Sequence, residues 1–415
     1  MAISDSVYGR TERYVSRARL HAMLEQEHQR MLEVLRAPRG ETTAFFTFAD
    51  TVSAKSFKGT NEQHGWMGIR FQAKPGDEDS EIILHVRMLD GDNATQSEAL
   101  GIVGVNLVHG ACFLHHDPVR LIESLLDNLS TQRIEIDMIE FSGAAFRNVD
   151  NRVASLVLVQ LGLSGAAMFD PDGQVLQPSE VLYKRPVLVQ RGTFRPFTHA
   201  HADILRAARD DFGQQLGNDG GKIVELVEIS MKTLLSGGEV DHQDFLARSD
   251  VIAAAGKTVL ISDYAEYYRL VGYLQRYTRR PIGIALGAGN LLELFKGDLQ
   301  SKLDQSLAGG VLEAVGRTFR NDTRIFVYPW RDPASGALTS VENLPTPAGV
   351  SKLYAYLVEQ GWLRSIQPSR HEYLSILPAD VAQRIEQGDV SWEADVPTDV
   401  AAVIKKQALF GYRPS

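Results

Sequence analysis

The residues best suited to chemistry lie in one ten-residue stretch between an apolar run and a helix-like run. The stretch GTFRPFTHAH extends from Gly192 to His201 and follows the apolar segment VLVQR. Its hydroxyl and imidazole groups can donate hydrogen bonds to anionic oxygens. The N-terminus of a following helix favours negative charge, because its first N–H groups lack partners. The stretch therefore predicts a site for an anion such as phosphate.

These ten residues resemble a motif of the adenylyl-transferring nucleotidylyltransferases, G-[ST]-F-x-P-x-[HT]-x-G-H, in which Ala200 replaces the second glycine. The resemblance implies that Thr198 and His201 are catalytic and contact the α- and β-phosphates. It also implies a nucleotide- and phosphate-binding set: Gly192, Thr193, Phe194, Arg195 and His199. The whole chain is similar to a bacterial family that is labelled automatically as nicotinate-nucleotide adenylyltransferase.

The activity implied by this resemblance is nucleotidyl (adenylyl) transfer to a phosphate-bearing acceptor, with release of pyrophosphate. Such transfer needs orientation and hydrogen-bond donors rather than a covalent intermediate. The expected cofactor is Mg²⁺, bound with the nucleoside triphosphate. The expected partner is a nucleotide or a phosphorylated small molecule.

A second glycine pair follows another predicted strand. Gly287 and Gly289 lie in IALGAGNLL, between an apolar run and a helix-like run. A G-x-G pair at such a turn is a partial dinucleotide fingerprint, and Leu292 stands where the third glycine would be. The pair predicts either phosphate binding or a closely packed turn.

The segment AMFDPDGQVL offers an alternative catalytic site. Its first half resembles the haloacid-dehalogenase-type phosphohydrolases, which implies Asp170 as nucleophile and Asp172 as acid or base with Mg²⁺. Asp-Pro-Asp-Gly is also a favourable type I turn between two strands. A third hypothesis is a non-catalytic nucleotide-responsive interaction protein. The ligands of any protein-held metal stay unknown, because no spacing of histidines and carboxylates compels a site.

The elements that must position these residues alternate between strand and helix patterns. Residues 101–110, 133–141, 165–170, 185–192, 222–230, 257–263, 281–287 and 323–330 read as strands, most of them separated by helix patterns. This alternation predicts an α/β fold, a mainly parallel Rossmann-like sheet with helices on both faces. An N-terminal helix and a small antiparallel β module precede it.

The predicted domains are an N-terminal helical segment, a β-rich module, an α/β core and a C-terminal cap. Their ranges are 1–40, 41–100, 101–365 with a subdivision near 180, and 366–415.

Composition narrows the class of protein. The formal net charge is -9, which argues against broad binding to nucleic acid and against binding to an anionic membrane surface. A single cysteine, Cys112, allows no internal disulfide and lies in an apolar run where we expect it to be buried. The first residues lack a signal-peptide core, so the expected location is cytoplasmic, with no membrane partner. A homo-oligomer is a further expectation.

Overall fold

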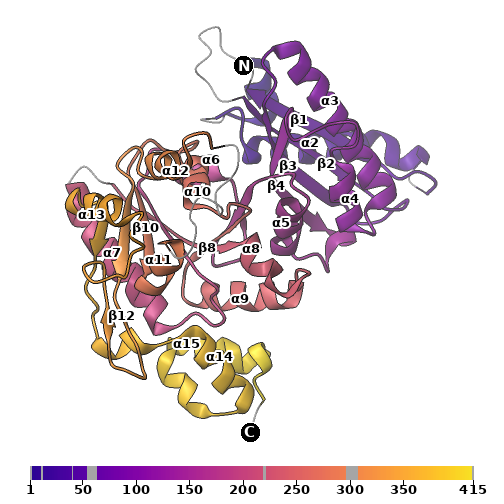
Figure 1. The fold of residues 1–415 in the computed structure, drawn as a ribbon. Helices are drawn as coiled ribbons and strands as arrows, with labels where there is room; N and C mark the ends of the chain where they lie inside the picture. Colours follow the sequence, from indigo (N-terminus) through magenta and orange to yellow (C-terminus); the bar gives the residue numbers. More distant parts are fainter. Residues whose placement is uncertain are drawn as a thin grey trace. The chain divides into compact units, whose positions relative to one another are not determined.

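The computed structural model describes residues 2–10, 13–39, 41–53, 63–217, 221–295 and 307–413 (Figure 1). The chain forms two compact units. Unit 1 is Met1–Ala167 with Gly173–Gln177, and unit 2 is Met168–Asp172 with Pro178–Ser415. The predicted domain boundaries at 40, 100 and 365 stay predictions.

Unit 1 is built on a four-stranded antiparallel sheet of order β1-β2-β3-β4. Its strands are β1 Phe46–Ser53, β2 His64–Phe71, β3 Ser80–Met88 and β4 Ile134–Gly143. Its helices are α1 Ala2–Tyr8, α2 Arg17–Arg39, α3 Asn93–His109, α4 Pro118–Ser124 and α5 Asn151–Gln160, with a π-helical turn η1 at Gly110–Leu114 and a 3-10 turn η2 at Ala144–Phe146. The predicted N-terminal helix and antiparallel module are confirmed.

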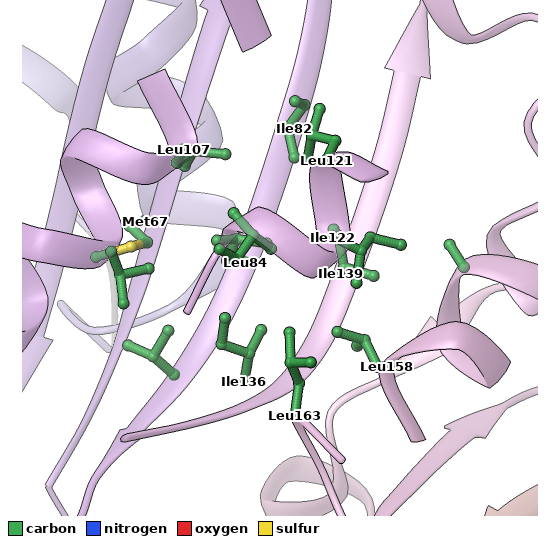
Figure 2. Close-up of a cluster of buried hydrophobic side chains, with 14 of the residues drawn as sticks. Met67, Ile82, Leu84, Leu107, Leu121, Ile122, Ile136, Ile139, Leu158 and Leu163 are labelled. Atoms are coloured by element: carbon green, nitrogen blue, oxygen red, sulfur yellow. The ribbon is translucent and has the colours of Figure 1, made fainter. Parts of the chain in front are cut away.

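The sheet of unit 1 has an apolar core on each face, because successive side chains point to opposite sides. Figure 2 shows one core, where Leu107, Leu121 and Ile122 from the helices face Leu84 and Ile136 from the strands. The other core is smaller. It joins α2 to the strands and consists of Leu20, Leu24, Trp66, Ile83, Met138 and Val175.

The prediction of a strand at residues 101–110 is wrong, because residues 101–109 lie within α3 and Gly110 begins η1. The Asp92 side chain caps the helix by accepting hydrogen bonds from the N–H groups of Ala94 and Thr95. A ten-residue apolar run does not separate strand from buried helix by periodicity alone.

In the described part of the chain, one helical segment, Asn93–Leu114, is long enough and apolar enough to span a membrane when length and composition alone are considered. Core helices of globular domains also satisfy them. The inner face of this segment packs on the sheet through Ala99, Val103 and Leu107.

Two further expectations need correction in unit 1. Residues 133–141 were expected in the parallel sheet, but β4 pairs antiparallel with β3. Cys112 is exposed, since it lies on the π-helical turn η1 and points away from the buried Gly110 and Ala111. Both errors arise from treating α3 as a strand, which shifts the start of the alternating pattern.

The larger sheet lies mostly in unit 2; its residues 166–167 and 175–176 fall within the ranges of unit 1. The strands of this sheet are β5 Ala166–Phe169, β6 Val175–Leu176, β7 Val187–Arg191, β8 Val224–Ser230, β9 Thr258–Ser262, β10 Ile282–Gly287, β11 Arg324–Tyr328 and β14 Leu363–Ser365, with a separate pair β12 Trp330–Arg331 and β13 Leu338–Thr339. The helices include α6 Pro178–Leu182, α7 His199–Leu216, α8 Met231–Leu234, α9 His242–Ala254, α10 Tyr267–Leu274, α11 Ala288–Phe295, α12 Gly310–Thr318, α13 Ser351–Glu359, α14 Pro378–Gln387 and α15 Thr398–Gln407.

The eight strands follow the order β14-β11-β10-β7-β8-β9-β5-β6. Pairing is parallel from β14 through β11, β10, β7 and β8 to β9. Counted along the chain, the strands from β9 to β14 have the order 3-2-1-4-5-6 of a doubly wound Rossmann-type sheet. The predicted α/β fold class is confirmed. The strand order reverses between β7 and β10, and ligands of such sheets bind outside the carboxyl ends of the strands at this point.

Helices cover both faces of this sheet at β7. Consecutive residues Gln190 and Arg191 point to opposite faces. On the face of Gln190, Phe212 of α7 approaches Gly283 of β10, at a position where a Cβ would lie 3.4 Å from the ring. On the other face, the Arg191 guanidinium lies 4.6 Å from the ring centre of Tyr267 in α10.

Candidate functional site

A cavity of about 1090 Å³ lies at the carboxyl ends of the parallel strands of unit 2. Its volume reaches the upper end of the ~300–1,000 Å³ typical of ligand pockets. Five predicted site residues that line it are Gly192, Thr193, His201, Gly287 and Gly289. The structure therefore brings together two turns that the sequence offered as separate candidates, because β7 and β10 are neighbours.

The turn between β7 and α7 is fixed by a reciprocal cap. Thr198 precedes the helix and its hydroxyl accepts the N–H of His201 at 3.4 Å. The Thr198 N–H in turn donates to Nδ1 of His201 at 3.0 Å. This is the capping-box arrangement, in which a side chain three residues into the helix reaches back to the cap. Thr198 is fully buried, and its role in the structure is to cap the N-terminus of α7.

The cap decides the protonation of His201. Because Nδ1 accepts a hydrogen bond, a neutral ring carries its proton on Nε2. Burial lowers the pKa of His201 to about 4, so the ring is neutral near pH 7. The ring centres of Phe194 and Phe197 lie 4.8 and 5.5 Å away. In the described structure the Nε2–H group has no protein acceptor, and the residue borders the cavity.

Gly192 has a packing role as well as a place in the cavity wall. A Cβ built on Gly192 would lie 2.8 Å from the ring of Phe194, so a larger residue does not fit. Phe194 itself is fully buried with a positive φ of 49°, a conformation uncommon outside glycine. The close approach that the motif implies for a ligand is made here by an aromatic ring.

Arg195 and His199 contact protein groups. The Arg195 Nε donates to Asp244 at 2.8 Å, and Arg195 also lies 3.6 Å from Glu386. The His199 ring stacks on Tyr373 at 5.1 Å between centres. Burial lowers the pKa of His199, so this ring is also less basic than a free histidine. Phe194, Arg195 and His199 are not among the residues that line the cavity. Their contact with a nucleotide stays a prediction.

The second turn is open. Among the described residues, no atom lies within 4 Å of a Cβ built on Gly287 or Gly289, so packing against these residues does not require the glycines. They stand at the end of β10 and the start of α11 and border the cavity. This arrangement leaves the backbone accessible to a ligand.

Sequence reasoning missed an ion pair at the cavity, where Arg191 is one of the lining residues. The Arg191 guanidinium donates to both carboxylate oxygens of Glu228, at 2.5 and 2.8 Å. It also donates to the carbonyl oxygens of Tyr264 and Ala265 at 2.6 Å each. Ser262 donates to Glu228 at 2.5 Å. The network connects β7, β8 and the loop after β9. Its signal in the sequence is a charged residue near the end of each of two apolar strands, Arg191 in β7 and Glu228 in β8.

The alternative site at Asp170 is a turn between β5 and β6. The Asp170 carboxylate accepts the N–H of Asp172 at 2.9 Å, as in an Asx turn, and Asp172 is exposed. Neither residue lines the cavity. Over the described ranges, no group of three or more His, Cys, Asp or Glu side chains is arranged to hold a metal ion.

Fold and site define the class of protein: an α/β chain whose doubly wound domain holds a ligand-sized cavity at its topological switch. No protein-family model matches the chain, and no curated protein matches it.

Among solved structures, the chain is similar to one from Vibrio parahaemolyticus that is provisionally described as a nicotinate-nucleotide adenylyltransferase. The identity is 11% and the TM-score is 0.22; the match covers 55% of this chain and 97% of that one.

Proposed function

We propose that unit 2 binds a nucleoside triphosphate in this cavity and transfers its nucleotidyl group to a phosphate-bearing acceptor. The observation that carries the proposal is the neutral His201, whose Nδ1 is occupied by the helix cap. Its Nε2–H is thereby kept as a donor at the edge of the cavity. The open glycine turn after β10 supports the same assignment.

The proposed reaction forms one bond and breaks one bond. A phosphate oxygen of the acceptor attacks the α-phosphorus, the bond from that phosphorus to the bridging oxygen breaks, and pyrophosphate leaves. The Nε2–H of His201 and the N–H groups of the first turn of α7 that the Thr198 cap leaves available would stabilise the charge on the phosphate oxygens. Lys232 lines the cavity and supplies a positive charge. Arg191 is committed to Glu228 and is less suited to this role.

Mg²⁺ fits this proposal only as an ion carried by the triphosphate. The described residues offer no cluster of three ligands for a metal. Mg²⁺ commonly keeps several waters and binds through substrate phosphates with one or two carboxylates. Bound in this way it would supply charge neutralisation, while the residues of the chain orient the phosphates.

Two substitutions of His201 separate its functions. In His201→Asn, the side-chain oxygen can still accept the Thr198 N–H, but the donor facing the cavity is lost. In His201→Gln, an amide N–H can reach the position of Nε2–H. Pyrophosphate release would be measured with each nucleoside triphosphate and with phosphorylated acceptors, including nicotinate mononucleotide.

We expect His201→Asn to lose about 10²- to 10³-fold in turnover, the usual cost of one transition-state donor. His201→Gln should retain a larger part. Wild-type turnover in His201→Asn would overturn the assignment. Nucleotide binding without pyrophosphate release from any acceptor would favour the non-catalytic hypothesis.

A further inference from the structure

Three cavity residues carry buried polar atoms that lack a hydrogen-bond partner in the described structure. They are Oε1 of Gln190, Oε2 of Glu266 and Nε1 of Trp330. Gln190 is at the end of β7, Glu266 is in the loop after β9, and Trp330 follows β11. Buried polar atoms are nearly always paired in native proteins, so these three atoms are available to pair with a ligand of the cavity.

Gln190 is the most informative of the three. Its side chain is 1% exposed and lies on a strand whose other residues include Leu188 and Val189. An amide in this position costs stability unless it is hydrogen-bonded, and a leucine or methionine would fill the same space. Packing in the protein alone therefore gives no reason for glutamine here.

Glu266 and Trp330 add complementary groups. The Glu266 carboxylate precedes α10 and lies 3.8 Å from Arg269, beyond hydrogen-bond distance. An oxygen of this carboxylate and the Gln190 oxygen accept hydrogen bonds, whereas the indole N–H of Trp330 donates one. A ligand that satisfies them must offer at least two N–H or O–H donors and one acceptor.

We infer that these groups bind the nucleoside part of the ligand, through the hydroxyl groups of the sugar or the N–H groups of the base. Phosphate oxygens act mainly as acceptors at neutral pH, so the phosphates alone do not satisfy Gln190 and Glu266. The inference rests on the proposed binding of a nucleotide in this cavity and is independent of the transfer step.

The test uses Gln190→Met, which keeps the approximate shape and removes the amide. We expect its affinity for a nucleoside triphosphate to fall about tenfold, as for a lost hydrogen bond to a buried group. We expect its ligand-free Tm to rise by about 2 °C or more, since an unsatisfied amide is removed. A purely structural glutamine would move the Tm in the opposite direction.

Gln177→Met is the matched control. Gln177 is 4% exposed, and its Nε2 donates to the buried Asp137 of unit 1 at 3.5 Å. Removing this partnered amide should lower the Tm and leave nucleotide affinity unchanged. A fall in Tm for Gln190→Met as well would overturn the inference.

Four probes identify the donors. Affinities would be measured for ATP, 2′-deoxy-ATP, 3′-deoxy-ATP and ITP, with inorganic tripolyphosphate as the ligand without a nucleoside. We expect tripolyphosphate to bind equally to wild type and Gln190→Met, and at least one analogue to lose affinity in the wild type only. Loss with a deoxy analogue assigns the sugar, and loss with ITP assigns the base.

The outcomes separate this inference from the proposed transfer. Unchanged ATP affinity in Gln190→Met, with wild-type pyrophosphate release intact, overturns the nucleoside contact alone. Reduced affinity without pyrophosphate release by the wild type supports the contact and overturns transfer. Absence of ATP, GTP, CTP and UTP binding by the wild type overturns both.

Discussion

Two sets of buried polar side chains, the His85–Asp137 network of unit 1 and the residues at the cavity of unit 2, differ in whether their hydrogen bonds are made within the protein. In unit 1, Nδ1 of His85 donates to Asp137 at 2.5 Å, and His85 Nε2 lies 2.9 Å from Nδ1 of His64. Gln177 contributes a further donor to Asp137. In unit 2, the Gln190 oxygen is buried without a hydrogen-bond partner among the described residues, and Gln190 and His201 both border a cavity.

The difference separates structure from function. A polar network whose members satisfy one another stabilises a fold and specifies its packing. Unpaired buried groups reduce stability and persist where a ligand pairs with them. By this criterion the His85 network is structural although it contains two histidines and a carboxylate, and the cavity of unit 2 is the proposed functional region.

The largest expected effect comes from breaking the satisfied network. His85→Leu would leave the Asp137 carboxylate, which is 0% exposed, without its main donor. We expect a loss of about 3–5 kcal/mol in unit 1, the usual cost of removing one partner of a buried charged pair. Hydrogen exchange of the β3 and β4 amides would measure it.

The double variant His85→Leu with Asp137→Leu sharpens this prediction. Since it removes the stranded charge, it should be more stable than His85→Leu alone. A loss below about 1 kcal/mol in His85→Leu would contradict a structural role for the network.

The next effect is the pH dependence of stability from His201. Burial lowers the folded-state pKa to about 4, below the ordinary value of 6.5. Between these values the unfolded state binds a proton that the folded state does not, so stability falls as the pH falls from 6.5 to 4. The full shift amounts to about 3 kcal/mol. Unfolding of wild type and His201→Asn at pH 7.0 and 4.5 would show a smaller decrease in the variant, and equal decreases would contradict the burial of His201.

A smaller effect should follow from Ser262→Ala, which changes the hydrogen bonding of Glu228, the partner of Arg191. Ser262 is 0% exposed and donates to Glu228, and Arg191 continues to pair with that carboxylate after the change. We expect a loss of about 2 kcal/mol, typical of a hydrogen bond to a charged group. Ser249→Ala is the control, because the Ser249 hydroxyl donates to a neutral backbone carbonyl and should cost less. A smaller loss for Ser262→Ala than for Ser249→Ala would show that Glu228 does not depend on this bond.

The sequence predicted the features that depend on residues close together in the chain, and missed those that depend on contacts between distant segments. The β7 strand, the α7 helix and the turn between them are local, so periodicity and turn residues predicted all three. In the structure, Gly192 and His201 of this stretch line the cavity. The prediction of a strand at residues 101–110 was wrong because the helical state of this segment depends on packing against the sheet of unit 1 and on the Asp92 cap. The unpaired state of Gln190 and the ion pair of Arg191 with Glu228 arise from contacts between strands, which a single strand's sequence does not carry.

The smallest expected effect is that of Asp170→Asn, which tests whether unit 2 has one functional region. An asparagine oxygen can accept the Asp172 N–H as the carboxylate does, so the turn should persist. We expect stability to change by about 0.5 kcal/mol or less, with unchanged nucleotide affinity. Hydrolysis of p-nitrophenyl phosphate with Mg²⁺ would be measured beside it. Wild-type hydrolysis that disappears in Asp170→Asn would establish a phosphohydrolase at this turn, and would show that a self-satisfied turn in this chain can still be catalytic.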